Sequence, residues 1–166
     1  MPTEAKLRTP EGETATQVVL AAFRANGLLL AAGDDLAVDE GLTSARWQVL
    51  GALAFAERPL TVPQIARRMG LTRQSVHATV KRLVRDRLVE LAPNTDHRRS
   101  QLVWLTELGR VRYAAIDGRQ ALWVNRLADG ISRSELETTA RILGELCRRL
   151  EADRVEDAEN DGGGDE

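Results

Sequence analysis

The hydrophobic and polar positions of residues 60–110 predict two short helices joined by a turn and followed by a two-stranded hairpin. Thr61 suits the N-cap of the first helix, because its hydroxyl can accept a backbone hydrogen bond while Gln64 reaches back to the cap. Gly70 suits the left-handed position that ends this helix. Thr72 is expected to cap the second helix, which extends to about Arg87.

The second of these helices has one apolar face and one polar face. Its apolar residues recur at the i, i+4, i+7 and i+8 spacing of an amphipathic helix. They are Val76, Val80, Leu83 and Val84, and the residues that point away are Arg73, Gln74, Ser75, His77, Ala78, Lys81 and Arg82. Two helices joined by a glycine turn form the helix-turn-helix pattern, whose second helix enters the major groove of DNA.

The hairpin that follows has the composition of a wing. Leu88–Ala92 and Gln101–Leu105 are strand-like, and residues 93–100 between them combine turn-forming residues with two adjacent arginines. These arginines, Arg98 and Arg99, suit a minor groove or the phosphates beside it. The order of helix, turn, helix and hairpin therefore predicts a winged helix-turn-helix.

The chain resembles the MarR family of bacterial winged-helix transcription regulators over residues 14–152. The matching segments are the leading helix GLTSARWQVLGAL, the helix-turn-helix PLTVPQIARRMGLTRQSVHATVKRLVRDRLVE and the end of the wing, LVWLTELG. The resemblance implies a mainly α fold with a small β-hairpin, in one domain over residues 13–154. Within it, a winged helix-turn-helix lobe of about residues 43–106 is joined to N- and C-terminal dimerisation helices, which are expected over about 13–32 and 107–153.

The wing departs from the family pattern, which usually carries Asp-x-Arg at a set distance before the Leu-Thr that ends the second strand. Counting back from Leu105–Thr106 selects Arg99 as the key arginine, with His97 in place of the aspartate. Counting forward from Asp96 selects Arg98 instead. Arg98 and Arg99 are therefore both candidates for the arginine of the wing that contacts DNA.

The polar face of the second helix is expected to contact both the bases and the phosphates of DNA, with different residues. Its first turn offers free backbone N–H groups and the positive end of the helix dipole to phosphate. Gln74 can pair with adenine and Arg73 with guanine, and His77 can reach a base edge or a phosphate. Lys81 and Arg82 suit the backbone. The predicted DNA contacts are Thr72, Arg73, Gln74, Ser75, His77, Lys81, Arg82, Arg98 and Arg99. The alternative is that this polar face is an ordinary solvent-exposed helix surface that binds no DNA.

The flanking segments are expected to form long helices. The N-terminal helix is expected to break at Gly33–Asp35, and the next helix is expected from Thr43 to about Glu57. Ser132 and Glu135 form a capping box for a last helix. Its apolar stripe consists of Leu136, Ala140, Leu143, Cys147 and Leu150. This stripe can pack within one protomer, or against a second copy as the resemblance implies. Residues 1–12 and 155–166 are expected to be flexible.

Charge is unevenly distributed along the 166 residues, whose net charge is −2. Residues 151–166 hold eight acids and one arginine, a net −7, which leaves +5 on the rest of the chain. Between Thr61 and Trp104, nine Lys or Arg face three acids, a local balance of +6. The negative net charge of the chain therefore comes from the tail. The segment from Thr61 to Trp104 is basic, which favours binding to a polyanion.

Catalysis, metals and cofactors find little support in the sequence. No nucleophile comes with a spaced partner constellation and no phosphate-binding glycine loop is present, so an enzyme is not expected. His77, His97 and Cys147 are too few and too scattered for a metal site. A lone cysteine permits no intrachain disulfide, and no signal-peptide or membrane-spanning pattern is evident, so a soluble cytoplasmic protein is expected.

The resemblance also implies an effector pocket between the dimer helices and the DNA-binding lobe, often filled by aromatic or phenolic molecules. Phe23, Trp47 and Trp123 are candidates to line it, with Arg46 as an anion partner, although each of these residues also suits plain core. The resulting hypothesis is a dimeric repressor of a pseudo-palindromic operator, released by a small aromatic effector. The alternatives are a ligand-independent activator or anti-repressor of the same fold and a winged-helix module for protein–protein assembly.

Overall fold

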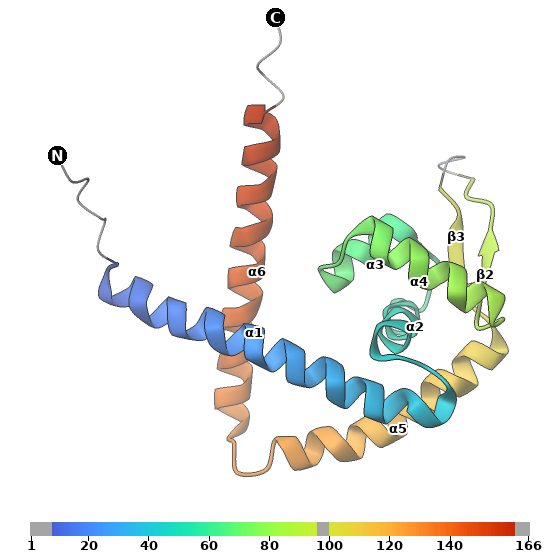
Figure 1. Ribbon diagram of the computed structural model, residues 1–166, viewed down its shortest axis with the longest axis horizontal. Helices are drawn as coiled ribbons and strands as arrows, with labels where there is room; N and C mark the ends of the chain where they lie inside the picture. Colours follow the sequence, from blue (N-terminus) through green and yellow to red (C-terminus); the bar gives the residue numbers. More distant parts are fainter. Residues whose placement is uncertain (1–7, 96–99, 162–166) are drawn as a thin grey trace, which may run out of the picture. The chain divides into compact units, whose positions relative to one another are not determined.

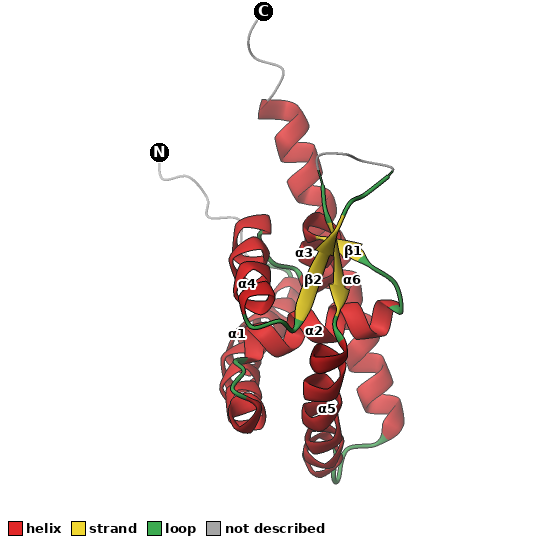
Figure 2. Cartoon of the chain, turned by 90° about the vertical axis from the view of Figure 1, so that its right-hand side faces the viewer, coloured by secondary structure: helices red, strands yellow, loops and turns green. Residues whose placement is uncertain are grey.

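The computed structural model of the protein describes residues 8–95 and 100–161, with side chains described as far as residue 153. These residues form a mainly helical fold with a small antiparallel sheet (Figures 1 and 2). The elements in chain order are α1 (Pro10–Ala37), η1 (Val38–Glu40), α2 (Ser44–Ala56), β1 (Leu60–Thr61), α3 (Val62–Met69), α4 (Arg73–Arg85), β2 (Val89–Ala92), β3 (Leu102–Leu105), α5 (Glu107–Leu127) and α6 (Arg133–Asp161). The chain divides into two compact units, one ending at Ala121 and the other beginning at Leu122.

The predicted helix-turn-helix is confirmed as α3 and α4. Thr61 and Gln64 form the expected capping box, with Thr61 N–H donating to Gln64 Oε1 at 2.8 Å and Gln64 N–H to Thr61 Oγ1 at 3.4 Å. Gly70 ends α3 at a φ of 61°, in the left-handed region. Thr72 Oγ1 accepts from Ser75 N–H at 3.1 Å and starts α4. Local hydrogen bonds thus set both helix boundaries.

The core of the first unit is built around α2. Residues from α2, α3, α4, the sheet and α5 meet in one buried cluster, which includes Val49, Leu50, Leu53, Leu60, Ile65, Val76, Val80, Leu83, Val89, Val103 and Ile116. Three of the four predicted apolar residues of α4 belong to this cluster, and the fourth, Val84, is half-buried at its edge. This packing turns the polar face of α4 outward.

The sheet has three strands in the order β1-β3-β2, whereas the sequence predicted a two-stranded hairpin. Leu60 pairs with Val103 on one side of β3, and Leu91 pairs with Val103 on the other. At two residues, β1 is too short to leave an alternating pattern in the sequence. It forms because burial of Leu60 brings its backbone alongside the free edge of β3.

Helix α1 is longer than predicted at both ends. Thr9 Oγ1 accepts from Gly12 N–H at 3.1 Å and caps a helix that begins inside the segment expected to be flexible. The expected break at Gly33–Asp35 is wrong, because these residues dock the helix onto α2. Asp34 Oδ1 accepts from Ser44 N–H at 2.6 Å, and a Cβ added at Gly33 would lie 2.6 Å from Ser44 Oγ.

By length and composition, Pro10–Glu40 is apolar enough to cross a membrane, with a mean hydropathy of 1.4 in its most apolar window. One such helix is not a convincing membrane span, because the core helix of a soluble protein and a signal sequence pass the same test.

Helix α6 starts at the predicted capping box and runs further than predicted. Ser132 N–H donates to Glu135 Oε2 at 2.9 Å, and Glu135 N–H donates to Ser132 Oγ at 3.3 Å. The helix ends at Asp161, so residues 155–161 of the expected disordered tail are helical. They contain no glycine or proline to interrupt the helix. Residues 162–166 lie outside the described residues.

Candidate DNA-binding interface

The outward face of α4 carries the predicted contacts. Thr72, Arg73, Gln74, Ser75, His77, Lys81 and Arg82 are all exposed. In the described part of the chain, none of the basic residues among them forms an ion pair with a carboxylate. The first turn of α4 also contains no acidic residue. The positive end of this helix is therefore not neutralised by a neighbouring side chain, and it can receive an anion.

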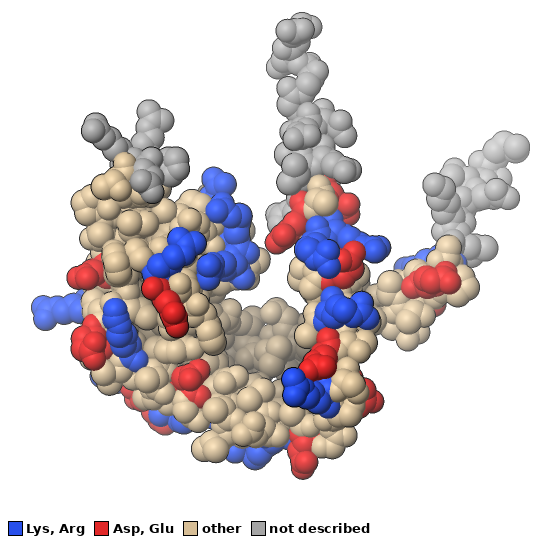
Figure 3. Space-filling view, turned by 180° about the vertical axis from the view of Figure 1, so that it is seen from behind, with Lys and Arg blue, Asp and Glu red and all other residues tan. Residues whose placement is uncertain are grey.

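The charges of α6 are arranged differently. Arg133 donates to Glu137 at 2.7 Å and Arg149 to Glu145 at 2.7 Å, and Arg148 also pairs with Glu145. Figure 3 shows basic and acidic side chains intermixed along this helix. Opposite charges that pair along a helix largely cancel one another. The basic residues that the described structure leaves unpaired on the exposed face of α4 are therefore the better candidate for binding an anion.

A polar depression lies between α3 and the loop end of the wing. It has a volume of about 530 Å³, and its lining includes Arg58, Thr61, Gln64, Arg67 and Ser100. Arg58 and Arg67 are both exposed. Sequence reasoning missed Arg58, because it follows the end of a helix and belongs to no periodic pattern.

The wing is described up to Thr95 and again from Ser100. Asn94 Nδ2 donates to Ser100 Oγ at 3.5 Å, just beyond the last pair of the two strands, Ala92 and Leu102. The candidates Arg98 and Arg99 lie outside the described residues, so the choice between them stays a prediction.

A second depression, of about 520 Å³, lies among α2, α3 and α5. Its aromatic lining consists of Trp47, Phe55 and Tyr113, and Arg68 also reaches it. The rings of Phe55 and Tyr113 meet edge to face, with centroids 6.4 Å apart. Tyr113 O–H donates to Asp117 Oδ1 at 3.2 Å. Burial, reinforced by the Asp117 charge, raises the pKa of Tyr113 to about 12.

The four residues predicted to form an effector pocket differ in their exposure and in their contacts. Trp47 lines the depression just described, but Phe23 stands 72% exposed on α1. Arg46 donates through Nη1 to the Gly41 carbonyl at 3.1 Å and pairs through Nη2 with Asp86. Trp123 belongs to the unit that begins at Leu122.

Sequence reasoning missed Phe55, Arg68 and Tyr113 as lining residues of this depression. The available signal was Tyr113 itself, the only tyrosine of the chain.

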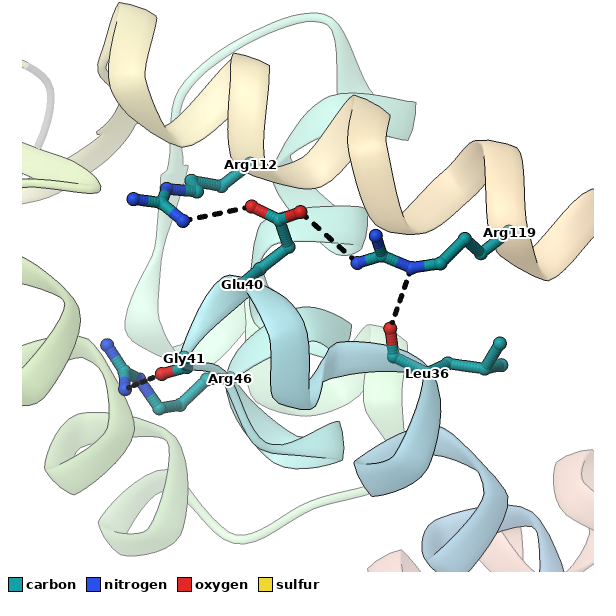
Figure 4. Close-up of polar contacts among 6 residues, drawn as sticks. All are labelled: Leu36, Glu40, Gly41, Arg46, Arg112 and Arg119. Atoms are coloured by element: carbon teal, nitrogen blue, oxygen red, sulfur yellow. Dashed lines mark hydrogen bonds and ion pairs between the residues drawn. The ribbon is translucent and has the colours of Figure 1, made fainter.

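A group of charged residues joins η1 to α5. Glu40 Oε2 accepts from Arg112 Nη1 at 3.0 Å, and its Oε1 accepts from Arg119 Nη2 at 3.3 Å (Figure 4). Arg119 Nε also donates to the Leu36 carbonyl at 3.1 Å. The hydrogen bond from Arg112, assisted by Arg119, holds the pKa of Glu40 below its ordinary value.

The MarR family model matches residues 40–100, which contain the whole helix-turn-helix and the first strand of the wing. An uncharacterized protein of Mycobacterium tuberculosis is 43% identical over 138 residues, covering 83% of this chain and 95% of that protein. The crystal structure of a MarR family transcription regulator superimposes with a TM-score of 0.70 at 25% identity, covering 88% of this chain and 95% of that one. The chain belongs to the MarR family. It is a DNA-binding transcriptional regulator and not an enzyme.

The chain is also similar to three other proteins. The transcriptional activatory protein BadR of Rhodopseudomonas palustris is 33% identical over 100 residues, covering 59% of this chain and 57% of that protein. CouR of Rhodococcus jostii, solved with p-coumaroyl-CoA, has a TM-score of 0.71 at 22% identity and covers 78% of this chain and 91% of its own. NadR, solved with 4-hydroxyphenylacetate, has a TM-score of 0.70 at 19% identity, covering 89% and 98%.

Proposed function

We propose that this MarR family protein is a homodimeric repressor that reads a pseudo-palindromic operator, with α4 of each protomer in a major groove. The observation that carries the proposal is the exposed face of α4, where Arg73, His77, Lys81 and Arg82 have no carboxylate partner in the described part of the chain. Helix-turn-helix dimers bind two half-sites about one helical turn apart. A symmetric operator therefore follows from a symmetric protein.

Two apolar faces support the dimer. Helix α1 exposes Val19, Phe23 and Leu30, which lie on one side of the helix, and Leu20, Leu28 and Leu29 are exposed around the rest of its circumference. Helix α6 exposes Leu136, Ile142, Leu143 and Leu150. Monomeric proteins rarely leave such extended apolar surfaces in water. A second copy is the proposed occupant of both faces, which would also bury α1 without a membrane, in a cytoplasmic protein.

The proposed contacts on DNA divide by position along α4. Arg73 and Gln74, in the first turn, would pair with guanine and adenine edges. Lys81 and Arg82, further along, would hold phosphates and add affinity without sequence information. Wing arginines Arg98 or Arg99 would take the flanking minor groove.

An aromatic effector is the proposed release signal. The depression lined by Trp47, Phe55 and Tyr113 offers aromatic surface, and Arg68 offers a cation for a carboxylate. The ligands of CouR and NadR are aromatic acids or their thioesters, which supports this class of molecule. Release would be a population shift, in which the effector binds better to a dimer whose recognition helices have the wrong spacing for DNA.

Selection from a random duplex library, followed by anisotropy titration of the winner over a salt series, tests the proposal. We expect a palindromic winner and a slope of log affinity against log salt of about −0.9 per phosphate neutralised. Weak binding to every sequence would indicate a general DNA-coating protein. No binding by a folded dimer would favour a protein-assembly module.

Activation is a second candidate for the sign of regulation, favoured by the 33% identity to the activatory protein BadR. In vitro transcription from a promoter that carries the selected operator separates the two. Repression predicts less transcript as protein is added, and activation predicts more.

A further inference from the structure

The recognition helix α4 is tied to the rest of its unit at its C-terminal end by charge. Asp86 is the C-cap of α4, and its carboxylate pairs with Arg46 of α2. The Arg46 side chain is only 15% exposed, and its Nε has no hydrogen-bond partner among the described residues. This guanidinium is thus held by two partners, the Asp86 carboxylate and the Gly41 carbonyl oxygen.

The segment that contains Gly41 is also linked to α5, through the residue before it. Glu40, which precedes Gly41, accepts hydrogen bonds from both Arg112 and Arg119 (Figure 4). These two arginines lie on one face of α5, seven residues apart. A continuous series of polar contacts therefore leads from α5 through residues 40–41 and Arg46 to the end of α4.

The contacts that α4 makes with the buried core are apolar. Val76, Val80 and Leu83 pack into the core, and apolar packing is non-directional. An ion pair made through a planar guanidinium fork is directional, so it can select one orientation among those that the apolar face tolerates.

We propose that Glu40, Arg46, Asp86, Arg112 and Arg119 form a charged strap that positions α4 relative to α5 and so sets the distance between the two recognition helices of the dimer. The proposal rests on the dimeric operator binding proposed above. None of the strap residues belongs to the predicted DNA contacts, so the strap acts on the preferred spacing of half-sites and leaves the preferred bases unchanged.

A set of operators whose half-sites are moved together or apart by one base pair tests the strap. Affinities would be measured by anisotropy for the wild type, Arg46→Met and Glu40→Gln. We expect the ratio of affinities between the selected spacing and its neighbours to change by about fivefold or more, the low end of ordinary coupling between sites. Base preference within one half-site should stay unchanged.

Arg85→Ala is the matched control. Arg85 Nε lies 3.8 Å from Asp86 Oδ1, but Arg85 is itself on α4 and is 75% exposed, so it links α4 to nothing else. The variant should keep the wild-type spacing profile. The exchange Arg46→Asp with Asp86→Arg reverses the ion pair, and we expect it to restore part of the spacing preference lost in Arg46→Met.

Two results would overturn the strap. One is a wild-type spacing profile in Arg46→Met and Glu40→Gln, and the other is an equal loss of affinity at every spacing, which is the signature of a stability defect alone. Denaturant unfolding of each variant identifies that defect directly. A wild-type protein that binds single half-sites without any spacing preference would instead refute the dimeric operator.

Discussion

The α-carbon of Gly109 lies against the backbone carbonyl of Leu88, so closely that an added Cβ would lie 2.0 Å from that oxygen. Thr106 secures the same junction, because its hydroxyl donates to the Arg87 carbonyl at 2.7 Å and accepts from Gly109 N–H at 3.0 Å. The start of α5 is thereby seated on the turn that joins α4 to β2.

Substitution of Gly109 should displace this junction. Because the obstacle is backbone and not a flexible side chain, we expect Gly109→Ala to lower the free energy of unfolding by about 1–3 kcal/mol or more. Gly118→Ala is the control, since nothing lies within 4 Å of a Cβ built there, and alanine should favour the helix by roughly 0.5–1 kcal/mol. Urea denaturation measures both, and equal stabilities would contradict the proposed clash.

Base reading and phosphate binding should separate along α4. Arg73→Ala should reduce discrimination between the selected operator and a base-substituted operator by about 1–3 kcal/mol. Lys81→Ala should weaken all duplexes alike and reduce the salt slope by about 1. Competition anisotropy with the two operators distinguishes these outcomes. A uniform loss in Arg73→Ala would place that residue on the backbone.

The exposed face of α1 should be needed for the dimer. We expect Phe23→Asp to weaken self-association by about 2 kcal/mol or more, the effect of losing a central apolar contact, which corresponds to more than tenfold in the dissociation constant. Arg24→Ala, about 100° round the same helix, is the control. Sedimentation over a dilution series reports the association, and an unchanged dimer in Phe23→Asp would exclude α1 from the interface.

The strap should make stability depend on acid pH. The pKa of Glu40 is lowered from 4.5, first by the hydrogen bond from Arg112. The charged form is therefore favoured by folding, and its contribution is complete above pH 4.5 and is lost as the pH falls through the lower folded value.

Glu40→Gln should consequently destabilise the protein at pH 7 and differ progressively less from the wild type below pH 4.5. Urea denaturation at a series of pH values measures this difference. Glu90→Gln, which removes an exposed carboxylate on β2, is the control for the change in net charge. A gap between wild type and Glu40→Gln that stays constant into acid would mean that the ion pairs of Glu40 contribute nothing to folding.

Filling the aromatic depression should weaken effector binding without changing the affinity for the operator. Gly51 lies on its wall, where an added Cβ would lie 3.4 Å from Tyr113 Cε2. Gly51→Leu should occupy the space and weaken binding of a probe such as 4-hydroxyphenylacetate by about tenfold or more, or about 1.4 kcal/mol. Calorimetry with Gly118→Leu as the matched control measures this. Undiminished binding in Gly51→Leu would move the effector elsewhere.

The sequence by itself determined the features of this protein that depend on neighbours a few residues apart. The caps at Thr61 and Thr72, the left-handed Gly70 and the buried stripe of α4 all follow from hydrogen bonds and periodicity within one or two turns. The recognition face follows from the same periodicity, since it consists of the positions that the buried stripe leaves outside.

Only the tertiary structure decided the features that join distant segments. The strand β1, the docking of Gly33 and Asp34 on Ser44, and the aromatic wall of Phe55 and Tyr113 leave no periodic mark in the sequence. Glu40 and Arg112 are 72 residues apart in the sequence, yet the Glu40 carboxylate joins η1 to α5. Such pairs form because the hydrophobic core brings their elements together, and charge then selects one arrangement among those that the core permits.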